Sequence, residues 1–92
     1  MLVKLIEVVR GIRGGSSTLN EIYVNSSHII SVSEDLMARE RLISETTQLG
    51  LVEGVRFSKV VIMEGTHSRS LTIVGTPAEV HHKVKKRQVL RG

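Results

Sequence analysis

The sequence contains no cysteine and no tryptophan, and Tyr23 and Phe57 are its two aromatic side chains. The absence of thiols excludes disulfide bonds and thiolate metal sites, and it fits a reducing compartment. With so few aromatic side chains, the core has to be built from valine, isoleucine and leucine. A core this modest leads us to expect a homo-oligomer, because a shared interface buries more apolar surface.

Long hydrophobic runs are also absent. No apolar stretch approaches the ~20 residues of a membrane-spanning helix. The opening segment MLVKLIEVVR carries Glu7 inside its apolar run and lacks a small-residue cleavage pattern, so it does not predict a secretory signal. We therefore expect no membrane partner and a cytoplasmic location, or the host cytoplasm if the protein is viral. The 92 residues suit a single domain over residues 1–92.

Five segments are rich in β-branched and other apolar residues and predict strands. Residues 2–9 form the first, and the glycine-rich GIRGGSSTLN that follows predicts a flexible connection. Residues 22–24 and 29–32 form either one bent strand or a tight hairpin. Residues 57–64 are expected to pair with residues 69–74 across the short GTHS connection. The sequence thus predicts an α+β fold with a small antiparallel β-sheet.

The segment over residues 35–50 is ambiguous, and it is either a helix or a mobile insertion in the sheet. Ser33 is a suitable cap for a helix with Glu34 and Asp35 in its first turn, and Gly50 is a suitable end. Its apolar residues form only a thin stripe. We take the segment as helical.

The clearest local signal marks the start of a C-terminal helix. Thr76 can cap the helix, Pro77 suits its first position, and Glu79 completes the T-x-x-E capping box. The helix is predicted over residues 77–89. At 100° per residue, Val80 and Val84 share one face and are its two strong apolar anchors.

The order of these elements resembles that of the flagellar FlbD-like proteins. The residues that carry the resemblance are Ile22, Val24, Asn25, Ile29, Val32, Val60, Ile62, Leu71, Ile73, Glu79 and Val80. They cover residues 22–33 and 57–84. The resemblance implies a compact sheet with a C-terminal helix. It transfers no site, and we carry over no flagellar role.

Motifs for catalysis or metal binding are weak. The chain has no G-x-S-x-G elbow, and its glycine-rich GIRGG segment lacks the lysine of a P-loop. The four histidines lack ligand spacing, since His81 and His82 are adjacent and point about 100° apart on a helix. We expect solvated histidines, with His28 partly buried beside Ile29. These features predict a protein that is not an enzyme and has no metal site or cofactor.

The positive charge is concentrated at one end of the chain. Residues 1–80 carry eight basic and nine acidic side chains, a net charge of −1, whereas residues 81–92 carry five basic side chains and no acidic one. Such a cationic helix creates a local field suited to a polyanion. A purely solubilising role is the alternative, because cations also favour helix C-termini.

Two function classes follow from these observations. The first is non-enzymatic binding of a phosphate-bearing partner, either nucleic acid or a small phosphorylated ligand of the nucleotide-signal type. Its predicted phosphate-binding residues are Arg10, Arg13, Lys83, Lys85, Lys86 and Arg87. The first two are candidates for direct phosphate contact, and an oligomer could gather them beside the helix of a neighbouring copy. The second class is a regulatory adaptor that docks on a protein partner through a sheet edge or the C-terminal helix.

Overall fold

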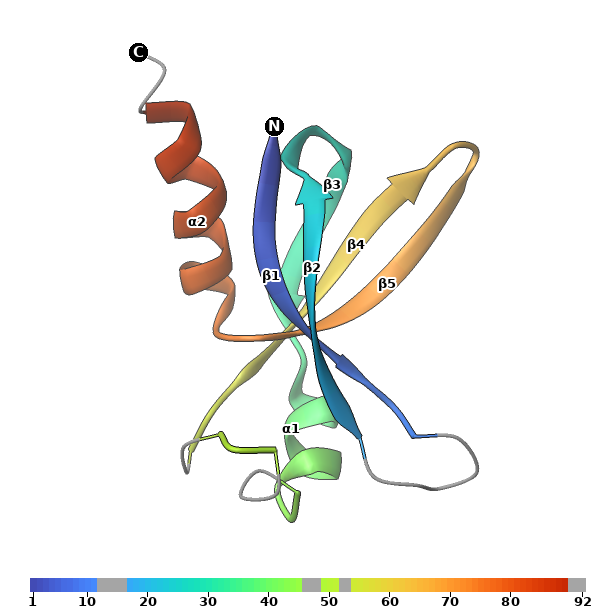
Figure 1. Cartoon of the computed structure of the whole chain (residues 1–92), viewed down its shortest axis with the longest axis vertical. Coiled ribbons are helices and arrows are strands. Elements are labelled where there is room, and N and C mark those ends of the chain that lie inside the picture. Colours follow the sequence, from blue (N-terminus) through green and yellow to red (C-terminus); the bar gives the residue numbers. More distant parts are fainter. Residues whose placement is uncertain (12–16, 46–48, 52–53, 90–92) are drawn as a thin grey trace.

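A computed structural model describes residues 1–11, 17–45, 49–51 and 54–89 of the chain. Over these residues the chain forms one five-stranded antiparallel sheet and two α-helices (Figure 1). The elements are β1 (Leu2–Val9), β2 (Thr18–Asn25), the 3-10 helix η2 (Ser26–His28), β3 (Ile29–Glu34), α1 (Leu36–Leu42), β4 (Phe57–Glu64), β5 (His67–Val74) and α2 (Pro77–Val89). The predicted α+β class with a C-terminal helix is confirmed.

The sheet is built from two hairpins. Strands β1 and β2 pair without interruption from Leu2–Asn25 to Val9–Thr18, and β4 pairs with β5 from Phe57–Val74 to Glu64–His67. The second hairpin confirms the predicted pairing, and its turn contains Gly65, whose φ of +61° suits glycine. The hairpins join where Glu7 of β1 pairs with Ile73 of β5. Figure 1 shows the β1–β2 hairpin crossing the β4–β5 hairpin.

Strands β2 and β3 lie on opposite edges of the sheet, in the order β2-β1-β5-β4-β3. The prediction of one bent strand or a tight hairpin over residues 22–32 is therefore wrong. The turn-prone residues between them form η2, which opens with the Asn25 side chain accepting from the Ser27 backbone N–H at 3.0 Å. Each strand then finds its partner elsewhere, because β2 pairs with β1 and β3 with β4.

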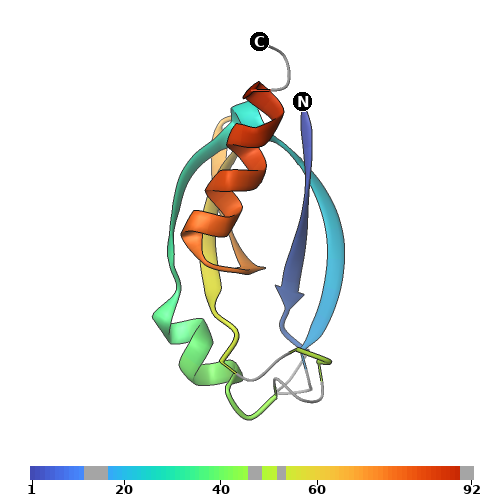
Figure 2. The same ribbon diagram turned by 90° about the vertical axis from the view of Figure 1, so that its left-hand side faces the viewer.

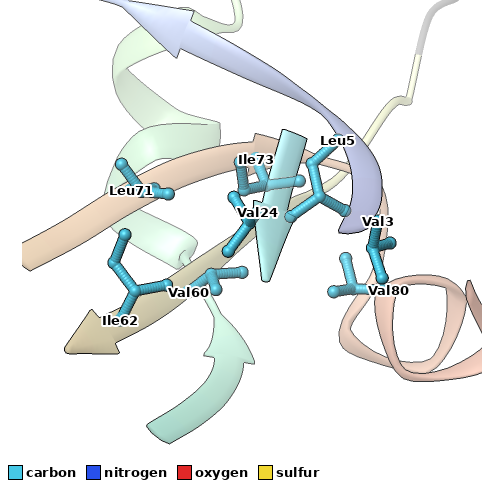
Figure 3. Packing of buried hydrophobic residues seen from close by; sticks show 8 residues of the cluster. All are labelled: Val3, Leu5, Val24, Val60, Ile62, Leu71, Ile73 and Val80. Atoms are coloured by element: carbon cyan, nitrogen blue, oxygen red, sulfur yellow. The ribbon is translucent and has the colours of Figure 1, made fainter. Parts of the chain in front are cut away.

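An inner core lies between the two hairpins and α2. Its buried members are Val3, Leu5, Val24, Val60, Ile62, Leu71, Ile73 and Val80 (Figure 3). Alternation along each strand places these residues on the same side of the sheet. Figure 2 shows α2 in front of the opening between β3 and β1, and α2 contacts both of these strands and β4. The helix thus closes one side of the curled sheet.

A smaller outer cluster lies on the opposite face of the sheet. Val8 and Phe57 point outward by alternation, and α1 covers them with Ala38 and Leu42. The predicted helix in this region exists, but it is shorter than expected. Its cap is Asp35, whose carboxylate accepts from the Ala38 backbone N–H at 3.0 Å, and not Ser33. Ser33 is unavailable as a cap because it belongs to β3 and pairs with Lys59.

Candidate functional site

The start of α2 is fixed by the predicted capping box. The Thr76 hydroxyl accepts from the Glu79 backbone N–H at 3.2 Å, and the Glu79 carboxylate accepts from the Thr76 backbone N–H at 3.0 Å. Just before them, Gly75 turns the chain out of β5 with a φ of +121°, a conformation that other residues rarely adopt. The direction of α2 relative to the sheet is therefore determined at its first turn.

The helix is held to the sheet along a narrow seam. Val80 is 1% exposed and belongs to the inner core, and the half-buried Val84 packs against that core one turn later. The side chains of His81, His82, Lys83 and Lys85 are exposed. The apolar side of α2 is thus occupied by the sheet, and the described side chains on its other sides face solvent.

The electrostatics of α2 divide the helix into two parts. The pKa of Glu79 is lowered, chiefly because its carboxylate accepts the backbone N–H of Thr76, then by the hydrogen bond with the Thr76 side chain, and further by the charge of Lys83 one turn away. This carboxylate also complements the positive end of the helix dipole. Within the described part of the chain, the ion pairs are Lys4–Glu21, Arg56–Glu34 and Arg69–Glu64, and none includes a cation of α2. Beyond Glu79 the helix carries positive charge alone.

The structure places the predicted phosphate-binding residues in two separate regions. Lys83, Lys85, Lys86 and Arg87 all lie on α2, and the side chains of the last two lie outside the described structure. Arg10 is exposed and follows β1. The end of β1 and the C-terminal half of α2 lie at opposite ends of the long axis in Figure 1. A small ligand held by both regions would therefore have to lie between two copies of the chain. Arg13 lies outside the described residues.

A second feature is a cleft of about 420 Å³ between β2 and the free end of the β4–β5 hairpin. Its lining residues are Ile22, Tyr23, Val24, Asn25, His28, Ile62, Met63, Glu64 and Arg69. Val24 and Ile62 are buried core residues, whereas Tyr23, His28, Glu64 and Arg69 are exposed. The exposure of His28 corrects the expectation that it is partly buried. It follows from the position of His28 in η2, which contributes no buried residue.

This cleft has no local signal in the sequence. Its residues come from two segments about 35 positions apart, and in the sequence they read as ordinary strand and turn residues. They come together only because β2 belongs to the hairpin that crosses β4 and β5. The pairing of β2 with β1 would have indicated the cleft, but the sequence did not predict which strand pairs with β1.

In the described ranges, no group of three or more histidine, aspartate or glutamate side chains is close enough to hold a metal ion. Neither of the helices described is long and apolar enough to cross a membrane.

Comparison with known proteins does not extend this picture, since no family model, no curated protein and no solved structure matches the chain. The resemblance to the FlbD-like proteins stays a prediction.

Proposed function

We propose that the chain is a non-enzymatic binding protein for a phosphate-bearing partner, acting as a homo-oligomer with α2 as its contact element. One observation carries this proposal: Val80 fixes α2 to the sheet while Lys83 and Lys85 remain exposed and outside every described ion pair. A helix fixed at one side presents its cations in a defined arrangement, which a free tail would not do. The cytoplasmic location stays a prediction.

Nucleic acid is the first ligand class to test, because a row of cations neutralises backbone phosphates without reading bases. Tyr23 is the exposed aromatic side chain, and Phe57 is buried, so base stacking has little support. We expect binding that tolerates changes of sequence and weakens with salt.

The test is fluorescence anisotropy with short DNA and RNA, single-stranded and duplex, at low and near-physiological salt. The tail variant Lys85→Ser, Lys86→Ser and Arg87→Ser should weaken binding and reduce the slope of log affinity against log salt by roughly 2 to 3, about 0.9 for each lost phosphate contact. The matched control removes three cations of the sheet region, Lys4→Ser, Arg56→Ser and Lys59→Ser. Equal losses of affinity in both variants would show that net charge alone accounts for the binding. If neither the native chain nor the variants bind, nucleic acid is excluded as the partner.

A small phosphorylated ligand is tested separately by thermal unfolding with nucleoside mono-, di- and triphosphates. A native-state ligand raises the unfolding temperature with its concentration. The Arg10→Ser variant should lose this shift if Arg10 contacts the phosphate directly. Sedimentation equilibrium tests the homo-oligomer, and a chain that stays monomeric would exclude a site shared between copies.

A regulatory adaptor is the second candidate, and β2 favours it. In the described structure β2 pairs on one side only, with β1, over all eight of its residues. Its other edge offers backbone groups to a partner strand. This candidate predicts binding that is insensitive to the tail variant.

A further inference from the structure

The inner face of the β4–β5 hairpin is only partly covered. Alternation from Val60 and Leu71 places Ile62, Glu64, His67 and Arg69 on this core-facing side. Ile62 is 6% exposed, whereas the other three residues are exposed. The β1–β2 hairpin therefore covers this face as far as Ile62 and leaves its outer end open.

The edge of β2 borders the uncovered region. The cleft is lined on one side by four consecutive β2 residues, 22–25, and on the other by residues 62–64 and Arg69. Along an edge strand, every second residue directs both its backbone N–H and its backbone C=O away from the sheet. One further strand beside β2 would extend the β1–β2 layer over the open end of the β4–β5 hairpin.

The side chains around the cleft combine an apolar floor with hydrogen-bond donors. Val24 and Ile62 supply apolar surface below the exposed His28 and Arg69. Arg69 donates through Nε to Glu64 at 2.5 Å, and within the described residues Glu64 is the partner of its side chain. Its side chain is 58% exposed. The remaining guanidinium N–H groups can therefore bind a carboxylate in the forked geometry that arginine favours.

We propose that the cleft binds an extended peptide segment that pairs with the free edge of β2. The segment places an apolar side chain over Val24 and Ile62 and a carboxylate against Arg69. About four residues of the segment cover the β2 edge, since an extended chain advances about 3.3 Å per residue. The free edge selects an extended backbone, and the exposed guanidinium N–H groups of Arg69 select a carboxylate on the segment. This inference rests on the adaptor function and is independent of α2.

The probe is an acetylated and amidated pentapeptide Ser-Val-Ser-Glu-Ser, titrated into the full chain labelled with ¹⁵N. Its valine and glutamate lie two residues apart, so an extended backbone directs both side chains to the same face. We expect amide shifts at residues 22–25, at His28, at residues 62–64 and at Arg69. The Arg69→Gln variant should bind about tenfold more weakly, as expected for loss of a hydrogen bond between charged groups. Arg56→Gln is the matched control, because Arg56 is also an exposed arginine paired with a glutamate, away from the cleft.

Two further probes separate strand addition from simpler binding. A pentapeptide with lysine in place of glutamate should bind more weakly, and one with a central proline should not bind, because proline cannot complete the strand pairing. The tail variant Lys85→Ser, Lys86→Ser and Arg87→Ser should bind the acidic peptide as the native chain does. Nucleic-acid binding and peptide binding can therefore fail independently.

Four outcomes would overturn the proposal. The first is the absence of amide shifts at the cleft, and the second is equal affinity for the acidic and lysine peptides. The third is an equal loss of peptide affinity in Arg69→Gln and Arg56→Gln. The fourth is that isobutyrate produces the same amide shifts as the peptide. The last would identify a site for small carboxylates without strand pairing. Shifts at the same residues that appear on concentrating the chain alone would assign the β2 edge to a second copy.

Discussion

Ser58 shows how a single polar side chain supports the junction between the sheet and α2. Its side chain has no exposed surface, and its Oγ donates to the Gly75 carbonyl at 2.8 Å. Gly75 is the residue at which the chain leaves β5 toward the helix. The Ser58→Ala variant would leave that buried carbonyl without its hydroxyl donor, and we expect a loss of about 1–3 kcal/mol in the free energy of unfolding. Urea denaturation measures this loss, and Ser31→Ala, at an exposed position of β3, should change stability by less than about 0.5 kcal/mol.

Glu79 makes the capping of α2 dependent on pH. Its pKa in the folded chain lies below the ordinary value of 4.5, chiefly because its carboxylate accepts the Thr76 backbone N–H. A lowered pKa stabilises the folded state fully above the ordinary value, and this contribution is lost as the pH falls from 4.5 through the lower folded-state value.

The expected result is that acid weakens the native chain more than the Glu79→Gln variant, which keeps a side-chain acceptor at this position but does not titrate. Urea midpoints of both chains, measured at several pH values from 7 to 3, test this expectation. The gap between the two midpoints should narrow below pH 4.5. A gap that stays constant with pH would show that the carboxylate charge contributes nothing to the cap.

Among the secondary-structure elements, α1 depends most clearly on a few side chains. Leu42 is fully buried against Phe57 and Val8, whereas Leu36, on the same helix, is 59% exposed. Leu42→Ala should lower the free energy of unfolding by about 2–5 kcal/mol, through the lost burial and the cavity that remains. Leu36→Ala is the matched control, and its expected effect is below about 0.5 kcal/mol. Similar losses for both variants would show that burial against Phe57 and Val8 does not set the stability of α1.

Elements whose signals lie within a few residues could be predicted from the sequence. The T-P-x-E pattern at residues 76–79 gave the start of α2, and the apolar runs around Gly65 gave the β4–β5 hairpin. These features depend on local capping and turn geometry, which neighbouring residues determine.

Elements whose boundaries depend on distant pairing could not be predicted. Ser33 is a good helix cap in isolation, but its pairing with Lys59 keeps it in β3 and moves the cap to Asp35. The separation of β2 from β3 has the same origin, because nothing between Asn25 and Ile29 shows that each strand pairs elsewhere. The cleft could not be predicted for this reason, whereas the cationic helix was visible in the charge distribution.

At the scale of the whole molecule, the inner core and the outer cluster share the same strands. Phe57 and Val60 lie on one strand, β4, but on opposite faces, and they belong to the outer cluster and the inner core, respectively. Neither group can lose its packing without disturbing a strand that the other needs. We therefore expect the single domain predicted from the sequence to unfold in one cooperative transition.

Leu5 and Leu42 provide matched probes of this cooperativity, because both are fully buried, the first in the inner core and the second in the outer cluster. Their methyl NMR signals should disappear at the same urea concentration, which should also be the midpoint given by far-ultraviolet circular dichroism. The Phe57→Leu variant should lower all three midpoints together, because the cavity that it leaves lies against a strand common to both groups. Earlier loss of the Leu42 signal would mean that α1 and its cluster unfold alone. In that case the sheet with α2 would be the stable unit that presents both the cationic helix and the β2 edge.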